Sequence, residues 1–223
     1  MVSRAVEDYL KVIYKLQQDG SRATTNAIAG KLRLRAASVT AMLQQLSEQG
    51  MAEYTPYRGA YLTESGLAAA LRVIRRHRLI ELYLTQHLSV PWDRVHDEAE
   101  RLEHALTPYL EERIDSKLGY PKFDPHGAPI PSNTGDVPEQ DLVPLSNLPL
   151  NTSSVVRHIP DDDPDRLRYV ASIGLLPDVR VTVTDRDSTN GDVSLTLTSA
   201  SGAEAAKIIS NAVAEQVFVK RPE

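Results

Sequence analysis

Residues 25–63 read TNAIAGKLRLRAASVTAMLQQLSEQGMAEYTPYRGAYLT, and this stretch decides the fold of the amino-terminal third. Thr25 or Asn26 is a suitable N-cap for a short helix. The turn Arg33-Leu34-Arg35 separates it from a second helix that we expect from Ala36 to Gln49. Two helices joined by so short a turn predict a helix-turn-helix.

Strand-like segments follow this pair of helices. Met51–Thr55 and Ala60–Thr63 flank a hairpin tip, Pro56-Tyr57-Arg58-Gly59. Before the pair, Arg4–Gln18 has the 3.6-residue apolar rhythm of an amphipathic helix. The order of helix, helix-turn-helix and hairpin predicts a winged helix-turn-helix.

The next segments are helical. We expect one long helix over Leu67–Leu88, broken at Pro91, and a second helical stretch over Asp93–Leu118 that Pro108 interrupts. These helices carry more apolar surface than one small domain can bury, and this excess predicts a homodimer.

Another change of pattern comes after residue 150. Asn151–His158, Val179–Asp185 and Val193–Thr198 alternate apolar and polar residues, and one short helix is expected over Asp165–Gly174. Several short strands in about 70 residues suggest a small SH3-like β-barrel.

The expected fold class is mainly α with a smaller β component. It comprises a winged helix-turn-helix, a helical dimerisation domain and a carboxyl-terminal SH3-like barrel. The predicted boundaries are 1–72 for the DNA-binding domain, 73–140 for the helical metal-binding and dimerisation domain, 141–150 for a linker, and 151–223 for the SH3-like domain.

Charge is unevenly distributed along the chain. Residues 1–78 hold 12 Lys and Arg against 6 Asp and Glu, a net charge of +6, whereas residues 79–223 hold 13 against 24, a net charge of −11. This asymmetry is expected when only the amino-terminal module contacts DNA phosphates. In the second helix of the pair and at the hairpin tip, the expected DNA-binding residues are Arg35, Ala37, Ser38, Thr40, Gln44 and Arg58.

Several protein classes are excluded by composition. The chain has no cysteine, which excludes disulfides and thiolate metal sites. No apolar run approaches the roughly 20 residues of a membrane span, and the charged start lacks a signal-peptide core. We therefore expect a cytoplasmic protein without a membrane partner.

Imidazole and carboxylate groups form two short clusters. On one helix, His96, Glu100, Glu103 and His104 would project at about 0, 40, −20 and 80° around the axis, so they share one stripe. His77 and Glu81, four residues apart, share a face of the preceding helix. Oxygen and imidazole donors on facing helices are typical of divalent metal sites.

In four blocks, the sequence resembles the diphtheria toxin repressor family of metal-dependent transcriptional regulators. These blocks are Glu7-Asp8-Tyr9-Leu10 with Ile13-Tyr14; Arg76-His77-Arg78-Leu79-Ile80-Glu81; Val95-His96-Asp97-Glu98-Ala99-Glu100 with Glu103-His104; and Pro125-His126-Gly127-Ala128-Pro129-Ile130-Pro131. Gly174-Leu175-Leu176-Pro177, before Val179-Arg180-Val181, looks like that family's SH3-like domain.

The resemblance implies a homodimer that binds double-stranded operator DNA when loaded with Mn²⁺ or Fe²⁺, with up to two ions per subunit. It implies a primary site of Asp8, Glu100, Glu103 and His104, and an ancillary site of His77, Glu81 and His96. The SH3-like domain completes the ancillary site in three-domain members. The acidic stretch Asp161, Asp162, Asp163 and Asp165 holds the matching positions here, and we expect Asp163 and Asp165 to contribute.

Two carboxylates favour manganese. Iron-sensing members place a sulfur ligand where Asp8 and Glu100 stand here, and hard oxygen ligands suit Mn²⁺ better. In this respect the chain is most like the manganese transport regulators, although those carry a further Glu where Lys11 stands here. Repression of metal-uptake genes is the expected outcome.

Two other functions, and a structural role for His126, are compatible with parts of this pattern. A metal-independent winged-helix regulator would sense a small molecule in an apolar pocket. A metalloenzyme would use the same donors on a four-helix bundle, but only Glu100-x-x-Glu103-His104 approaches the required motif. His126, in a loop between prolines, is expected to be structural more often than a ligand.

Overall fold

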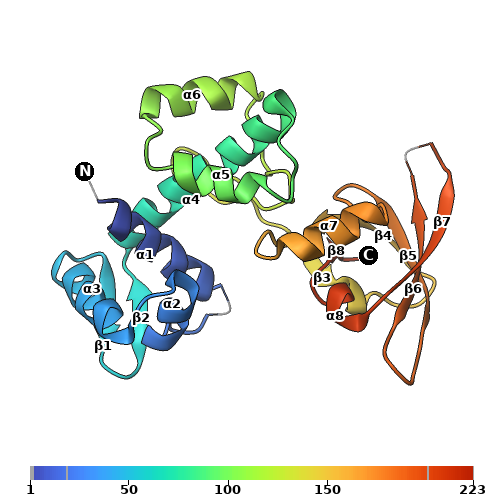
Figure 1. Ribbon diagram of the computed structural model, residues 1–223, viewed down its shortest axis with the longest axis horizontal. Helices are drawn as coiled ribbons and strands as arrows, with labels where there is room; N and C mark the ends of the chain where they lie inside the picture. The colour runs from blue at the N-terminus through green and yellow to red at the C-terminus, as the bar shows by residue number, and fades with distance from the viewer. Residues whose placement is uncertain (1–2, 19, 200, 223) are drawn as a thin grey trace. The chain divides into compact units, whose positions relative to one another are not determined.

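The computed structural model (Figure 1) describes residues 3–18, 20–199 and 201–222. It divides into two compact units. The first unit comprises Met1–His77, Glu103–Leu106 and Pro131–Asp136. The second comprises Arg78–Leu102, Thr107–Ile130 and Val137–Glu223. Each unit has its own hydrophobic core.

A winged helix-turn-helix forms most of the first unit, as predicted. Its elements are α1 (Arg4–Leu16), α2 (Thr25–Leu32), α3 (Ala36–Glu48), β1 (Ala52–Thr55), β2 (Gly59–Leu62) and the first part of α4 (Glu64–Leu88). The strands β1 and β2 pair antiparallel as the wing (Figure 1). Leu10 and Ile13 of α1 share one core with Ile28 of α2 and Val39 of α3, so movement of α1 is coupled to α3, the second helix of the helix-turn-helix, which is the recognition helix of this fold.

One predicted cap is wrong. Thr24, and neither Thr25 nor Asn26, is the N-cap of α2, because its backbone is extended and its hydroxyl accepts a hydrogen bond from the backbone N–H of Ala27 at 3.2 Å. The left-handed Arg33 ends the helix and starts the predicted turn.

In the second unit, the predicted helical stretch 93–118 is two helices, α5 (Val95–Leu102) and α6 (Pro108–Lys117). The break at Pro108 is confirmed: Thr107 caps α6, and its extended backbone suits the position before proline. The prediction that Glu103 and His104 lie on the same helix as His96 and Glu100 is wrong, because α5 ends at Leu102 and these two residues lie in the turn that follows.

A six-stranded antiparallel sheet forms the SH3-like part, in the order β3-β8-β4-β5-β6-β7. The strands are β3 (Leu142–Pro144), β4 (Ser153–His158), β5 (Arg180–Arg186), β6 (Val193–Thr198), β7 (Glu204–Ile209) and β8 (Phe218–Lys220). The helix α7 (Pro164–Ser172) contributes Leu167 and Val170 to its core. The three-residue helix η1 (Leu145–Asn147) and the short α8 (Asn211–Ala214) complete this part.

The core of the sheet explains the predicted alternation. Val181 and Val183 of β5 and Leu195 of β6 point inward and are buried, while the residues between them are more exposed. In the described part of the chain, no helix is both long and apolar enough to cross a membrane.

Candidate metal centre

The first donor cluster is built on α1 and on the turn after α5. Val6, Tyr9 and Leu10 bury the inner face of α1, and Asp8 lies beside them on the helix. Ligand atoms of Asp8, Glu103 and His104 lie within 4.8 Å of one another. All three belong to the first unit, so one compact body holds them.

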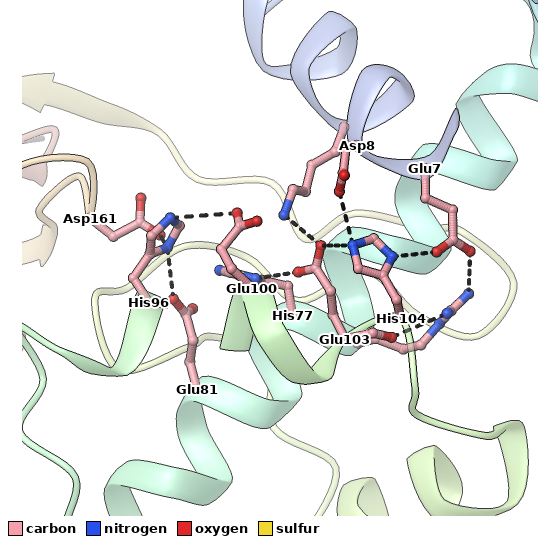
Figure 2. A network of polar contacts seen from close by, with 11 residues as sticks. Glu7, Asp8, His77, Glu81, His96, Glu100, Glu103, His104 and Asp161 are labelled. Atoms are coloured by element: carbon pink, nitrogen blue, oxygen red, sulfur yellow. Dashed lines mark hydrogen bonds and ion pairs between the residues drawn. The ribbon is translucent and has the colours of Figure 1, made fainter. Parts of the chain in front are cut away.

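His104 lies at the centre of this cluster (Figure 2). Its Nδ1 is 2.6 Å from Oε2 of Glu7, and its Nε2 is 2.9 Å from Oδ1 of Asp8 and 3.3 Å from Oε1 of Glu103. Nε2 is buried, and among the described residues it meets no partner with the geometry of a hydrogen bond. A buried ring nitrogen with two carboxylates around it fits a divalent cation, which accepts the lone pair that no donor uses.

Glu103 is completely buried and lies between two basic groups. Its Oε1 is 2.6 Å from Nζ of Lys11, and its Oε2 is 2.5 Å from Nδ1 of His77. Burial by itself would raise the pKa of this carboxyl, but the hydrogen bond from His77 and the charge of Lys11 outweigh it, so the pKa is lowered. Glu103 is therefore held as the carboxylate that a metal ligand requires.

The second donor cluster lies in the second unit and centres on His96 of α5. Nδ1 of His96 is 3.2 Å from Oε1 of Glu81 and 2.9 Å from Oδ2 of Asp161, and its Nε2 is 3.6 Å from Oε1 of Glu100 (Figure 2). Burial lowers the pKa of His96, but the carboxylates of Asp161 and Glu81 outweigh it and raise the pKa to about 10. Three oxygen donors around one imidazole again fit a divalent cation.

The acidic stretch before α7 contributes Asp161 to this cluster. Asp163 instead caps α7 by accepting from the backbone N–H groups of Asp165 and Arg166, each at 3.0 Å. Asp165 is exposed and pairs with Arg168. We expected Asp163 and Asp165 to bring a carboxylate from the SH3-like part to the ancillary site, but in the structure Asp161 is the residue of this stretch that contacts His96.

A third grouping shares Glu81. Ligand atoms of Glu81, Asp124 and His126 lie within 4.8 Å of one another, and all three residues are buried. Burial and the charge of Glu81 raise the pKa of Asp124 to about 6. Nε2 of His126 lies 2.8 Å from the carbonyl oxygen of Trp92, to which only a protonated nitrogen can donate. Its Nδ1 is buried without a hydrogen-bond partner in the described residues.

The loop that carries His126 is held against β4. Gly127 has a φ of +85°, and a Cβ there would lie 1.7 Å from the carbonyl oxygen of Arg157. The carbonyl of His126 accepts from the backbone N–H of Ile159 at 3.0 Å. A cavity of about 730 Å³, lined in part by Trp92 and Asp124, borders this loop.

The predicted DNA-binding residues are accessible. Arg35 precedes α3 and is exposed, as are Ala37, Ser38 and Gln44 on the helix, whereas Thr40 is half-buried. Arg58 is exposed at the tip of the wing. Exposed residues at the start of a recognition helix and at a wing tip are those that reach bases and phosphates in this fold.

The predicted ligands belong to both units of the chain. Asp8, Glu103 and His104 come together in the first unit, and Glu100 belongs to the second, where it approaches His96. Of the predicted ancillary set, Glu81 and His96 come together, and His77 contacts Glu103 in the first unit. Sequence reasoning did not assign roles to Glu7 or Asp124, although both stand in or beside the quoted blocks, and it named Asp161 only as part of the acidic stretch.

Comparison with known families matches all three parts of the chain. Residues 1–60 match the family described as "Iron dependent repressor, N-terminal DNA binding domain", and residues 63–132 match "Iron dependent repressor, metal binding and dimerisation domain". Residues 143–221 match the family described as "FeoA domain".

Individual proteins similar to this chain are also metal-dependent repressors by their descriptions. The iron-dependent repressor IdeR of Mycobacterium tuberculosis is 33% identical over 189 residues, covering 79% of this chain and 82% of that protein. A solved structure described as a manganese-dependent transcriptional repressor in complex with manganese is 38% identical, with a TM-score of 0.87, and covers 96% of this chain and 99% of that one. The structure of ScaR with bound Cd²⁺ is 28% identical, with a TM-score of 0.80, and covers 97% and 99%.

Proposed function

This chain belongs to the iron-dependent repressor family, which includes the diphtheria toxin repressors. On this premise, we propose that it is a homodimeric transcriptional repressor that binds operator DNA when activated by Mn²⁺. The family consists of metal-dependent transcriptional repressors and not of enzymes. The chain itself carries a DNA-binding domain, a metal-binding and dimerisation domain, and a FeoA domain of SH3-like type.

The observation that carries this proposal is the cluster of Asp8, Glu103 and His104. Glu100 is the fourth predicted ligand. A cation held there supplies the positive charge that the carboxylates of Asp8, Glu100 and Glu103 require, and it binds Nε2 of His104. Asp8 stands on α1, and α1 shares the core of the DNA-binding domain with α2 and α3. Holding Asp8 therefore fixes α1, and through the shared core it fixes the recognition helix.

Mn²⁺ is favoured over Fe²⁺ by the donor chemistry. Asp8 and Glu100 are hard carboxylate donors at the positions where iron-sensing relatives carry sulfur, and the chain has no cysteine. The manganese named in the description of a relative that is 38% identical supports the same choice.

A second site is proposed around Glu81 and His96. Asp161 brings a carboxylate from the SH3-like part to His96, and Asp124 and His126 face Glu81 within the same unit. His77 remains a predicted ligand of this ancillary set. The full complement is then up to two ions per subunit, with the second stabilising the docking of the SH3-like part on α5.

Dimerisation is supported by exposed apolar residues in the second unit. Leu102, Tyr109 and Leu110 are 45%, 75% and 48% exposed, and all lie within the matched dimerisation domain. A symmetric dimer would place two recognition helices on one face of DNA, so the proposed operator is an inverted repeat with half-sites about one helical turn apart.

The test is a DNA-binding titration of metal-stripped protein with Mn²⁺, anaerobic Fe²⁺ and Zn²⁺ in parallel, with His104→Ala as the variant. We expect wild-type protein to bind operator DNA only with metal and at the lowest concentration of Mn²⁺. His104→Ala, folded by circular dichroism, should lose this response, because it removes the central donor. Metal-independent binding, or an unchanged response of His104→Ala, would contradict the proposal.

A further inference from the structure

Two consecutive residues of α1 contact opposite nitrogens of one imidazole ring. Oε2 of Glu7 is 2.6 Å from Nδ1 of His104, and Oδ1 of Asp8 is 2.9 Å from Nε2 (Figure 2). Asp8 is a proposed metal ligand, whereas the contact of Glu7 lies on the side of the ring away from the cluster. The two carboxylates therefore have different roles.

The contact of Glu7 sets where the ring carries its proton. A carboxylate oxygen accepts hydrogen bonds and cannot donate them, so Nδ1 carries the proton that is donated to Glu7 in this contact. Nε2 is then the nitrogen left to bind a cation, and it lies beside Asp8 and Glu103 without a hydrogen-bond partner in the described residues. The tautomer that binds a cation is the one that Glu7 stabilises.

Glu7 is itself held in place by Arg76 of α4. Nη2 of Arg76 lies 3.4 Å from Oε1 of Glu7, and its Nη1 donates to the backbone carbonyl of Glu103 at 3.3 Å. The side chains of Arg76 and Glu7 are only 16% and 14% exposed, so solvent screens this pair weakly. Arg76 thus joins α1 to the turn that carries two proposed ligands.

We propose that Glu7, anchored by Arg76, is a positioning residue for the primary metal site: it orients His104 and fixes its proton on Nδ1 without binding the ion itself. This inference rests on the proposed function of Asp8, Glu103 and His104 as metal ligands. It gives α1 two separate links to the same ring, one through the ion and one that exists without it.

The first test is ¹⁵N NMR of the histidine rings in metal-free protein, with the His104 signals assigned from a His104→Gln variant. In wild type, the nitrogen shifts should report a proton on Nδ1 that is hydrogen-bonded to Glu7. Glu7→Ala should move the population towards the Nε2-protonated form, which is the more common form of unconstrained histidine. Glu7→Gln keeps an accepting oxygen at the same place and should preserve the wild-type tautomer.

The second test is Mn²⁺ affinity, measured by competition with a fluorescent chelator. Loss of such a partner typically lowers metal affinity about 10- to 100-fold, and we expect a loss of this size in Glu7→Ala and a smaller one in Glu7→Gln. Glu64→Gln removes an exposed carboxylate at the start of α4 and is the control, with no change in either measurement. If Glu7→Ala does not fold, Arg76→Met takes its place, and reduced Mn²⁺ affinity is again expected.

The role of Glu7 and the metal site itself can be contradicted separately. A Glu7→Ala protein with the wild-type tautomer, or with wild-type Mn²⁺ affinity, would overturn the positioning role while leaving the metal site intact. A His104→Gln protein with wild-type Mn²⁺ affinity would overturn the metal site itself. The tautomer of the metal-free ring is a readout that a merely structural role of Glu7 in packing α1 would not change.

Discussion

Nζ of Lys11 lies 2.6 Å from Oε1 of Glu103, and both side chains are almost completely buried. The same Oε1 lies 3.3 Å from Nε2 of His104, so the ammonium group contacts an oxygen of the proposed primary site. In the metal-free protein, Lys11 compensates the charge of a carboxylate that would otherwise be costly to bury.

Lys11→Met should therefore destabilise the metal-free protein. Removing one partner of a buried ion pair typically costs about 3–5 kcal/mol, although His77 still donates to Glu103 and should reduce this loss. Added Mn²⁺ should restore more stability to Lys11→Met than to wild type, because the ion then supplies the missing charge and no ammonium competes for Oε1. Thermal unfolding with and without Mn²⁺ measures both effects.

Lys15→Met provides the matched control, since Lys15 is an exposed lysine on the same helix. It should unfold like wild type with and without metal. Equal stability of metal-free Lys11→Met and wild type would show that the ion pair does not hold Glu103 in the folded protein.

The second predicted effect concerns the buried group of Glu81, Asp124 and His126. Oδ1 of Asp124 accepts from the backbone N–H groups of His126 and Ala128 at 2.8 and 2.9 Å. Asp124→Asn keeps an oxygen for these bonds and removes the negative charge. It should retain the loop and lower the number of Mn²⁺ ions bound per subunit from two towards one.

Equilibrium dialysis followed by metal analysis gives that number. Asp97→Asn, an exposed carboxylate on α5 next to His96 in sequence, is the control and should bind as wild type does. Asp124→Asn with unchanged stoichiometry and unchanged affinity for the second ion would remove Asp124 from the proposed site.

The amino-terminal fold could be predicted because its signals are local. Periodic apolar residues such as Leu10, Ile13 and Leu43 are completely buried, and the hairpin tip at Pro56–Gly59 separates the two wing strands as expected. The short strands β3 and β8 were not predicted, because three residues are too few to show alternation. In β7, small and exposed residues such as Ala205 and Ala206 carry no strand signal.

The donors of the metal site could be predicted, but not how they would be arranged. Spacing along one helix suggested that Glu103 and His104 belong with His96 and Glu100, yet α5 ends at Leu102 and the chain turns. The contacts of Lys11 and Glu7 join residues more than 90 positions apart. Such pairs depend on how the helices pack, and local periodicity contains no information about that.

Arg58 at the wing tip should contact a phosphate. Arg58→Ala is expected to weaken binding to all operators by a similar factor and to reduce the slope of log K against log salt by about one unit. Fluorescence anisotropy at several salt concentrations measures this slope. Arg180→Ala, an exposed arginine on β5, should leave it unchanged. A loss limited to one operator base pair would instead place Arg58 in base recognition.

The choice of metal can be tested at Glu100. A thiolate at this position should favour softer ions, because sulfur ligands raise affinity along the series from Mn²⁺ towards Fe²⁺ and Co²⁺. Glu100→Cys should therefore need more Mn²⁺ for half-maximal DNA binding while responding to Fe²⁺ or Co²⁺ as well as wild type or better. Asp8 remains as a hard ligand, so we expect a partial shift and not a complete exchange. The midpoint of DNA binding is measured for each metal under anaerobic, reducing conditions.

Glu98→Cys introduces a thiol on the same helix at an exposed position that pairs with Arg101, and it should keep the metal ranking of wild type. Because Oε1 of Glu100 lies 3.6 Å from Nε2 of His96, Glu100→Cys also reports on the second cluster. Repeating the titration in a His96→Ala background separates the two contributions. If the ranking shifts only when His96 is present, Glu100 acts in the second site. If wild type and Glu100→Cys rank the metals identically in both backgrounds, Glu100 is not a ligand and the preference for Mn²⁺ depends on other donors.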